Sequence, residues 1–283
     1  MSGMTLCLFA STPDIAPLGF IVKVLTGPFD TIAQTAIAWG YDGIEFMPDP
    51  EHVPDPMKCE RALKSAGAQM PVVNSGRIFA QGLALLHQEA TIRQRAMTGF
   101  KAMLDFGGYF RSKVHLGIAR GSGIPGASRA EMDGMAEDIF RELTDHAEQT
   151  GATIVLEPAE SNLTSYINTM ADVMAWVDRI ASPAFRPMLD THQLYGAEAS
   201  VESGIRAARG MAQHIHLYDP SRWPPGVRTG TETLDWLHIA HVLREEGFSG
   251  SGSVVLIDQG DPESSARASA AYLRRLFREP RQE

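Results

Sequence analysis

The chain has 283 residues, of which 44% are hydrophobic and 21% are charged, and its formal net charge is −9. This composition is typical of a globular protein with a full hydrophobic core, and the acidic charge argues against a nucleic acid as the main partner. The two cysteines, Cys7 and Cys59, share no short motif, which favours a reduced cytoplasmic protein over a disulfide scaffold. No apolar run approaches the roughly 18 residues of a membrane span, and the start of the chain does not resemble a secretory signal.

Short apolar runs alternate with longer amphipathic segments along the chain. The pattern predicts strands at Thr5–Ala10, Gly43–Met47, Pro71–Asn74, Lys113–Leu116, Thr153–Glu157, Pro187–Asp190, Gln213–Asp219 and Ser253–Asp258. It predicts helices at Phe29–Trp39, Met57–Ala66, Leu83–Phe106, Arg129–Gln149, Met170–Ile180, Val201–Arg209, Leu234–Glu246 and Glu263–Arg278. Because alternating strands and helices form parallel sheets, eight such units favour an α/β fold with a single (β/α)8 TIM barrel over residues 1–283.

The seventh predicted strand places two histidines on one face. Side chains alternate along a strand, so His214 and His216 point one way while Ile215 and Leu217 face an apolar layer. His216 lies nearer the carboxyl end of the strand. We therefore expect His216 to reach a functional site and His214, one pleat deeper, to support it.

Polar residues end several of the predicted strands. The strongest candidates end strands five to eight, and they are Glu157, Asp190, His216 and Asp258. Strand ends of a barrel meet at one face, where carboxylates without a cation would repel one another and raise one another's pKa values. One nitrogen with several oxygens suits a divalent ion such as Mn²⁺, Mg²⁺ or Co²⁺, with Zn²⁺ as an alternative.

Four segments resemble the xylose isomerase-like TIM-barrel superfamily. They are Ile-Val-Leu-Glu-Pro (154–158), Leu-Asp-Thr-His (189–192), His-Ile-His-Leu-Tyr-Asp (214–219) and the strand that ends at Asp258. The superfamily contains sugar isomerases, ketose 3-epimerases, hydroxypyruvate isomerases, inosose dehydratases and endonuclease IV repair enzymes, and the chain is most similar to the ketose 3-epimerase and hydroxypyruvate isomerase-like members. The resemblance implies metal binding by Glu157, Asp190, His216 and Asp258.

The resemblance also implies a reaction. It is a divalent-metal-dependent isomerisation or epimerisation of a keto-sugar or related small hydroxy-carbonyl compound through a metal-stabilised enediolate. Glu157 and Asp258 are the implied acid and base, Mn²⁺ is the expected ion, and no organic cofactor is needed. The expected substrate-binding residues are His192, Arg222, His115, Asn74 and Glu45. The partner is a small carbohydrate, and a homo-oligomer is expected.

Two departures from the epimerase pattern leave the reaction open. Asp258 stands where the family usually has Glu, and Leu163 stands where the epimerases carry a second Glu, six residues after Glu157. The nearby Glu160 does not restore that position. The alternative is an inosose dehydratase-like lyase that eliminates water beta to a ketone at the same metal site. A repair endonuclease with several zinc ions and a non-catalytic sugar-binding barrel are further hypotheses.

Overall fold

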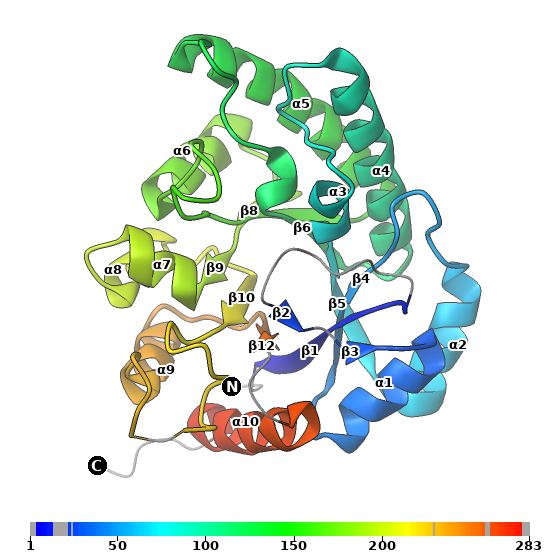
Figure 1. The fold of residues 1–283 in the computed structure, drawn as a ribbon, viewed down its shortest axis with the longest axis vertical. Helices are drawn as coiled ribbons and strands as arrows, with labels where there is room; N and C mark the ends of the chain where they lie inside the picture. The colour runs from blue at the N-terminus through cyan, green and yellow to red at the C-terminus, as the bar shows by residue number, and fades with distance from the viewer. Residues whose placement is uncertain (1–3, 14–21, 24, 229, 258–260, 279–283) are drawn as a thin grey trace.

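The computed structural model describes residues 4–13, 22–23, 25–228, 230–257 and 261–278. Helices surround a parallel sheet (Figure 1). The strands are β1 (Thr5–Ser11), β2 (Val22–Lys23), β3 (Leu25–Thr26), β4 (Gly43–Met47), β5 (Gln69–Asn74), β6 (Lys113–Leu116), β7 (Thr153–Leu156), β8 (Phe185–Pro187), β9 (Leu189–Asp190), β10 (His214–Leu217), β11 (Ser251–Val254) and β12 (Leu256–Ile257). The helices are α1 (Phe29–Ala38), α2 (Pro56–Ala66), α3 (Gly76–Ala80), α4 (Ala90–Tyr109), η1 (Ile118–Arg120), α5 (Arg129–Thr150), α6 (Met170–Ile180), α7 (Thr191–Ala197), α8 (Val201–Ala207), α9 (Trp236–Glu245) and α10 (Pro262–Arg278).

The main sheet closes on itself. Its strand order is β8-β7-β6-β5-β4-β1-β11-β10-β9, and all of these pairings are parallel. Only Met188 separates β8 from β9, so the two form one extended run, of which β8 pairs with β7 and β9 pairs with β10. This run joins the two edges of the sheet, and the predicted single (β/α)8 barrel is confirmed.

Local sequence explains the surrounding helices. Before α5, Ser128 and Glu131 form a reciprocal capping box, and Gly151 ends the helix in the left-handed conformation with φ 79°. One face of α5 is apolar, and the fully buried Phe140 ring packs edge-on against Trp176 of α6 at a centroid distance of 5.1 Å. The helices thus cover the sheet with apolar faces, and the strands they cover present their ends to the site.

Two predicted elements were wrong in part. The predicted helix Leu83–Phe106 has no helical structure in residues 83–89, and α4 begins only at Ala90. The amide groups of Leu85 and Leu86 instead donate hydrogen bonds to carbonyl oxygens of the η1 turn, at 3.1 and 2.8 Å. The predicted strand Ser253–Asp258 is interrupted at Val255, because β12 leaves the barrel and pairs antiparallel with β2.

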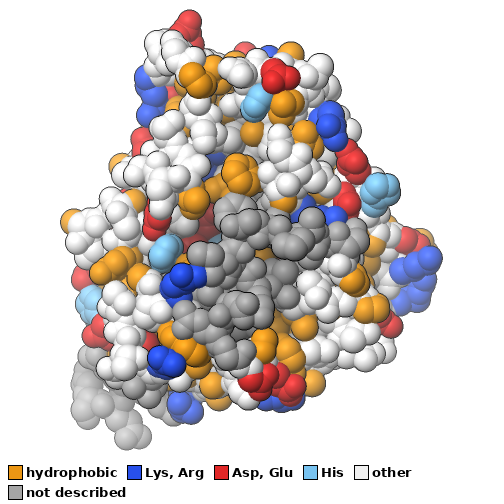
Figure 2. Space-filling model, in the orientation of Figure 1, with side chains coloured by type: hydrophobic (Ala, Val, Ile, Leu, Met, Phe, Trp, Pro, Cys, Tyr) orange, Lys and Arg blue, Asp and Glu red, His pale blue; other side chains and the backbone are white. Residues whose placement is uncertain are grey.

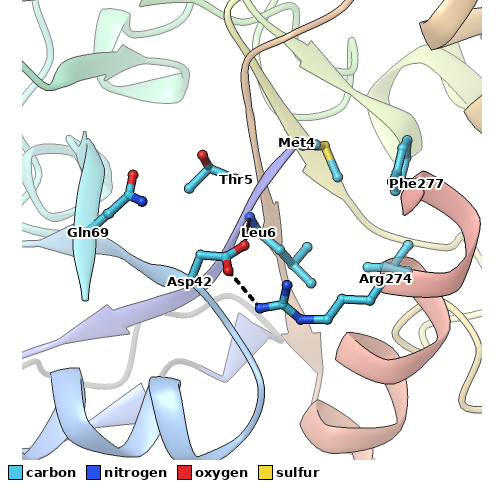
Figure 3. A pocket seen from close by; sticks show the side chains of 8 residues that line it. Met4, Thr5, Leu6, Asp42, Gln69, Arg274 and Phe277 are labelled. Carbon is cyan, nitrogen blue, oxygen red and sulfur yellow. Dashed lines mark hydrogen bonds and ion pairs between the residues drawn. The ribbon is translucent and has the colours of Figure 1, made fainter. Parts of the chain in front are cut away.

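A cavity of about 250 Å³ lies at the amino end of the barrel. Figure 3 shows Arg274 extending from α10 to Asp42, with which it forms an ion pair at 2.8 Å. Asp42 also accepts a hydrogen bond from the amide of Leu6 at 2.9 Å, and Arg274 donates to the carbonyl of Gly40 at 2.7 Å. These contacts join the last helix to the first two barrel strands, which indicates a role in stability at this end.

Figure 2 shows acidic and basic side chains interspersed over the described part of this face. None of the helices in the described ranges has the length and apolar character needed to cross a membrane.

Candidate functional site

Three predicted site residues meet at the carboxyl ends of neighbouring strands. Glu157 follows β7, Asp190 ends β9, and His216 lies directly opposite Asp190 in β10. The Nδ1 atom of His216 lies 2.9 Å from Oε1 of Glu157 and 3.4 Å from Oδ2 of Asp190. All three residues are buried, with 5–7% of their surface exposed. The strand ends therefore bring two carboxylates and one imidazole to a single point, as the sequence predicted.

Glu45 lies beneath this point and holds His216 from behind. It has no exposed surface, and its Oε1 atom lies 3.0 Å from Nε2 of His216. Its Oε2 atom lies 3.0 Å from Nε2 of His214, and Asn74 donates a hydrogen bond to Oε1 at 2.6 Å. Because Nε2 of His216 directs its hydrogen bond to Glu45, the Nδ1 atom is the nitrogen that faces Glu157. The structure thus places Glu45 behind the histidine strand, and His214 deeper than His216, bonded through its other nitrogen to Ser251 at 2.8 Å.

The buried charges shift the pKa values of the two histidines in opposite directions. Burial disfavours the charged form of His216, but the carboxylates of Glu45 and Glu157 outweigh it and raise the pKa of His216 well above its usual value. For His214, burial prevails over the Glu45 hydrogen bond and lowers the pKa to about 4. Burial would raise the pKa of Glu157, yet His115 and His216 hold it well below its usual range. Glu157 is therefore an ionised carboxylate, and His214 is a neutral ring.

His115 completes the surroundings of Glu157. Its Nε2 atom lies 2.8 Å from Oε2 of Glu157, while its Nδ1 atom is buried without a hydrogen-bond partner among the described residues. Gly117 makes this approach feasible, because a Cβ there would lie 2.5 Å from Nε2 of His115 and 2.6 Å from Oε2 of Glu157. A side chain at this position would separate the two groups.

Arg120 fixes the backbone on which Glu157 stands. The side chain is fully buried and donates hydrogen bonds to four carbonyl oxygens, those of Gly117, Glu157, Tyr166 and Ile167, at 2.6–3.1 Å. Burial lowers its pKa to about 10, so the guanidinium stays charged at neutral pH. Arg120 therefore crosslinks the loop after β6 to the loop after β7 and holds the backbone of Glu157 in place.

The two carboxylate oxygens of Asp190 have different roles, since one caps a helix and the other faces the site. Oδ1 accepts hydrogen bonds from the amides of His192 and Gln193 at 2.8 and 3.0 Å and so caps α7. Oδ2 is left to face His216. The same turn brings the His192 ring against Tyr218, at a centroid distance of 4.5 Å. A carboxylate that caps a short helix is thereby fixed in orientation toward the site.

These groups line a cavity of about 320 Å³. Its polar lining includes Asn74, His115, Glu157, Glu160, Asp190, His192, Gln193, His216 and Tyr218, with apolar side chains such as Phe9, Ile118 and Leu163 beside them. Lysine and arginine are absent from the described lining. A cavity of this size with several hydrogen-bonding groups on its wall suits a small polar molecule.

Two predicted substrate-binding residues, Glu45 and Arg222, do not line the cavity in the described structure, and Glu45 is instead fully buried behind His216. Asp258 lies outside the described residues. Arg222 is half-buried, has a left-handed φ of 71°, and donates its amide to the carbonyl of Asp219 at 2.8 Å. Its charge still acts on Tyr218, whose pKa is raised by burial and by Asp190 and is lowered by Arg222. Arg222 thus lies near the wall without lining it.

Sequence reasoning missed several polar residues of the wall, among them Tyr218 and Glu160. Tyr218 shares a strand face with His216, so the two-residue period could have identified it. Glu160 lies in an irregular loop after β7, where no periodicity indicates which side chains face the cavity.

The donor set fits a divalent cation. Oε1 of Glu157 and Nδ1 of His216 are 2.9 Å apart, yet Oε1 is buried without a hydrogen bond of acceptable geometry. Two donor atoms that converge without bonding each other are suited to sharing a cation. His115, Glu157 and His216 offer donor atoms within 4.8 Å of one another, as do Glu45, His214 and His216. In the second group the carboxylate already accepts hydrogen bonds from both rings and an amide, so the first group, with Asp190 beside it, fits better.

Comparisons with known proteins find sugar epimerases among the relatives of this chain. A 3-dehydro-D-guloside 4-epimerase of Escherichia coli is 28% identical over 156 residues, which cover 53% of this chain and 57% of that protein. A D-psicose 3-epimerase of Enterocloster bolteae is 29% identical over 112 residues, 40% of this chain and 36% of that protein. The matched segments thus span about half or less of these relatives.

Solved structures show the same fold over nearly the whole chain. A 3-keto-D-glucoside 4-epimerase of E. coli superposes with a TM-score of 0.78 at 19% identity, covering 96% of this chain and 99% of that one. An L-ribulose 3-epimerase gives 0.79 at 17% identity, covering 96% and 95%. The sequence model of the xylose isomerase-like TIM barrel family matches residues 33–276. The chain therefore belongs to the xylose isomerase-like TIM barrel family.

Proposed function

We propose that this protein is a divalent-metal-dependent sugar epimerase or isomerase. The observation that carries the proposal is the convergence of Glu157, Asp190 and His216 on the floor of a polar cavity, with donor atoms left free to share a cation. The sugar epimerases among the relatives support the same class. We propose Asp258 as a fourth ligand and second acid–base group, by the family resemblance alone.

Glu157, Asp190 and His216 would hold the cation, which when bound polarises the ketone of the substrate. Oxygen ligands with one nitrogen favour Mn²⁺. The Glu157 carboxylate is ionised, and it takes the proton from the carbon beside the ketone and returns it. Its bond to His115 and the Arg120 crosslink orient this carboxylate before the substrate binds. The apolar wall beside it limits access of water to the carbanion.

The relatives act at different carbons, so the proposal covers both substrate types. One is named for the 4-position of a keto-glycoside and the other for the 3-position of a free ketose. The test incubates the Mn²⁺-supplemented protein with D-psicose, D-fructose, D-tagatose and 3-keto-glucosides, and reads mass and stereochemistry of the products. Epimerisation conserves mass, whereas the lyase alternative loses water and produces an absorbing conjugated ketone.

Two variants connect turnover to the site. We expect Glu157→Gln to abolish turnover with the fold intact, and His216→Ala to lose bound metal in elemental analysis. Near-normal activity of Glu157→Gln would contradict the mechanism. A wild-type protein that retains none of Mn²⁺, Co²⁺ or Mg²⁺ after reconstitution would contradict the metal site.

A further inference from the structure

Glu160 is a carboxylate on the cavity wall that the metal site does not use. It lies in the loop after β7 and lines the same cavity as Glu157 and Asp190. About a fifth of its side chain, 21%, is exposed, and its Oε1 atom lies 3.1 Å from Nε2 of His192. A charged group in such a position needs either a structural or a ligand-binding explanation.

The surroundings of Glu160 hold its carboxylate in one place. The amide of Glu160 donates a hydrogen bond to the side-chain oxygen of Gln193 at 2.6 Å, which fixes the backbone against α7. Gly196, one turn further along α7, leaves room for the carboxylate, because a Cβ there would lie 2.9 Å from Oε1. Three positions of one short helix thus accommodate this side chain.

His192 makes the only ion-pair contact that the described residues give the Glu160 carboxylate. The other ring nitrogen, Nδ1, is buried without a partner among the described residues, and the ring face packs on Tyr218. Among the described residues, the ring thus has one polar contact, the approach of Nε2 to Oε1 of Glu160 at 3.1 Å. This leaves Oε2, and part of the capacity of Oε1, available to the cavity.

We propose that Glu160, oriented by His192, binds a hydroxyl group of the sugar and selects substrates that carry this hydroxyl. A carboxylate accepts hydrogen bonds and cannot donate them, so it matches hydroxyl donors, which a sugar presents on every carbon outside the ketone. The inference rests on the proposed function, and it assigns the substrate contact to a residue that the family pattern leaves out. His192 acts on the substrate through Glu160 and is a positioning residue.

The test compares four variants with the wild type. Glu160→Ala removes the acceptor, Glu160→Gln keeps its shape without the charge, and Gly196→Ala displaces the carboxylate without deleting it. Glu202→Gln is the matched control, because Glu202 forms an exposed pair with His238 at 2.7 Å outside the cavity. The probes are D-psicose, D-fructose and D-tagatose, measured by turnover and by calorimetric titration of the Mn²⁺-loaded protein, together with elemental analysis of bound Mn²⁺.

We expect Glu160→Ala to raise KM and the calorimetric Kd by about tenfold to a hundredfold, as loss of a hydrogen bond to a charged group does. The kcat should change much less, and bound Mn²⁺ should match the wild type. The KM and Kd of Glu160→Gln and Gly196→Ala should lie between those of the wild type and Glu160→Ala, and the values of Glu202→Gln should equal those of the wild type. A deoxy analogue that lacks the contacted hydroxyl should bind the wild type and Glu160→Ala equally.

Unchanged KM and Kd in Glu160→Ala would overturn this inference, while turnover by the wild type would leave the proposed function standing. Loss of Mn²⁺ from Glu160→Ala would also overturn it, because the residue would then act through the cation site. A wild type that binds and turns over none of the sugars would overturn the proposed function and this inference together. If the wild type turns over only the 3-keto-glucosides, the same comparisons of KM, Kd and bound Mn²⁺ are made with that substrate.

Discussion

Substitution of Glu45 by Gln tests the support behind the proposed metal ligand. Glu45 is fully buried and faces three nitrogen donors, on His214, His216 and Asn74, at 2.6–3.1 Å. Gln has the same shape, but its amide nitrogen is itself a donor and must face one of these nitrogens. The Nε2 proton of His216 then loses its charged acceptor, and the ring is no longer fixed with Nδ1 toward Glu157.

The magnitude follows from this geometry. Loss of an outer carboxylate on a ligating histidine typically lowers metal affinity about 10- to 100-fold, which corresponds to about 1.4–2.8 kcal/mol. The mismatched donor costs a further ~1–3 kcal/mol of stability. This is less than the ~5–15 kcal/mol that stabilises a typical domain, so we expect Glu45→Gln to fold.

The assay is calorimetric titration of the metal-free protein with Mn²⁺, with circular dichroism to establish folding. Glu60→Gln is the control, since Glu60 makes the same kind of charge contact with Lys64 at 2.7 Å on the surface. We expect the Mn²⁺ Kd to rise about 10- to 100-fold in Glu45→Gln and to stay unchanged in Glu60→Gln. A folded Glu45→Gln protein with the wild-type Kd would refute the role assigned to Glu45.

Three further predictions concern activity and stability. Gly117→Ala would place a carbon 2.6 Å from Oε2 of Glu157, so turnover should fall at least tenfold without unfolding. The control is Gly134→Ala in α5, which has open space around it and should leave turnover unchanged while adding about 1 kcal/mol of stability. Equal turnover in both variants would contradict the steric argument. Arg120→Met should lower the free energy of unfolding in urea by about 4 kcal/mol, because four buried carbonyl oxygens lose their donor; a loss below about 1 kcal/mol would contradict the crosslink. Burial would raise the pKa of Asp172, but backbone and hydroxyl donors at the start of α6 lower it below 3.8. The ionised Asp172 therefore stabilises the folded protein fully above pH 3.8, and this stabilisation is lost as the pH falls through the folded-state pKa. The free energy of unfolding of Asp172→Asn should therefore fall less steeply in acid than that of the wild type. The same steepness in both proteins would contradict the role of Asp172 in capping α6.

The amino-acid sequence by itself determined the barrel and the floor of the site. Strand alternation and helix caps are local signals, and polar residues at the ends of apolar strands can be read without knowing what they contact. Parallel strands of a barrel bring their carboxyl ends to one face. Glu157, Asp190 and His216 could therefore be grouped from sequence alone, and the structure places Nδ1 of His216 within 3.4 Å of a carboxylate oxygen of each of the other two.

Only the tertiary structure decided the features that depend on partners distant in the chain. Leu85 and Leu86 lie in an apolar stretch that suits a helix, but their amides bond to the η1 turn, more than thirty residues away. Glu45 lies in the middle of β4, whereas Glu157 follows β7, and only the packing of the strands places the Glu45 carboxylate behind His216. Glu160 has no periodic neighbours, and only the packing of its loop against α7 turns it toward the cavity. Local periodicity specifies which way a side chain points within its element, while the depth of that side chain and its partners depend on how the elements pack.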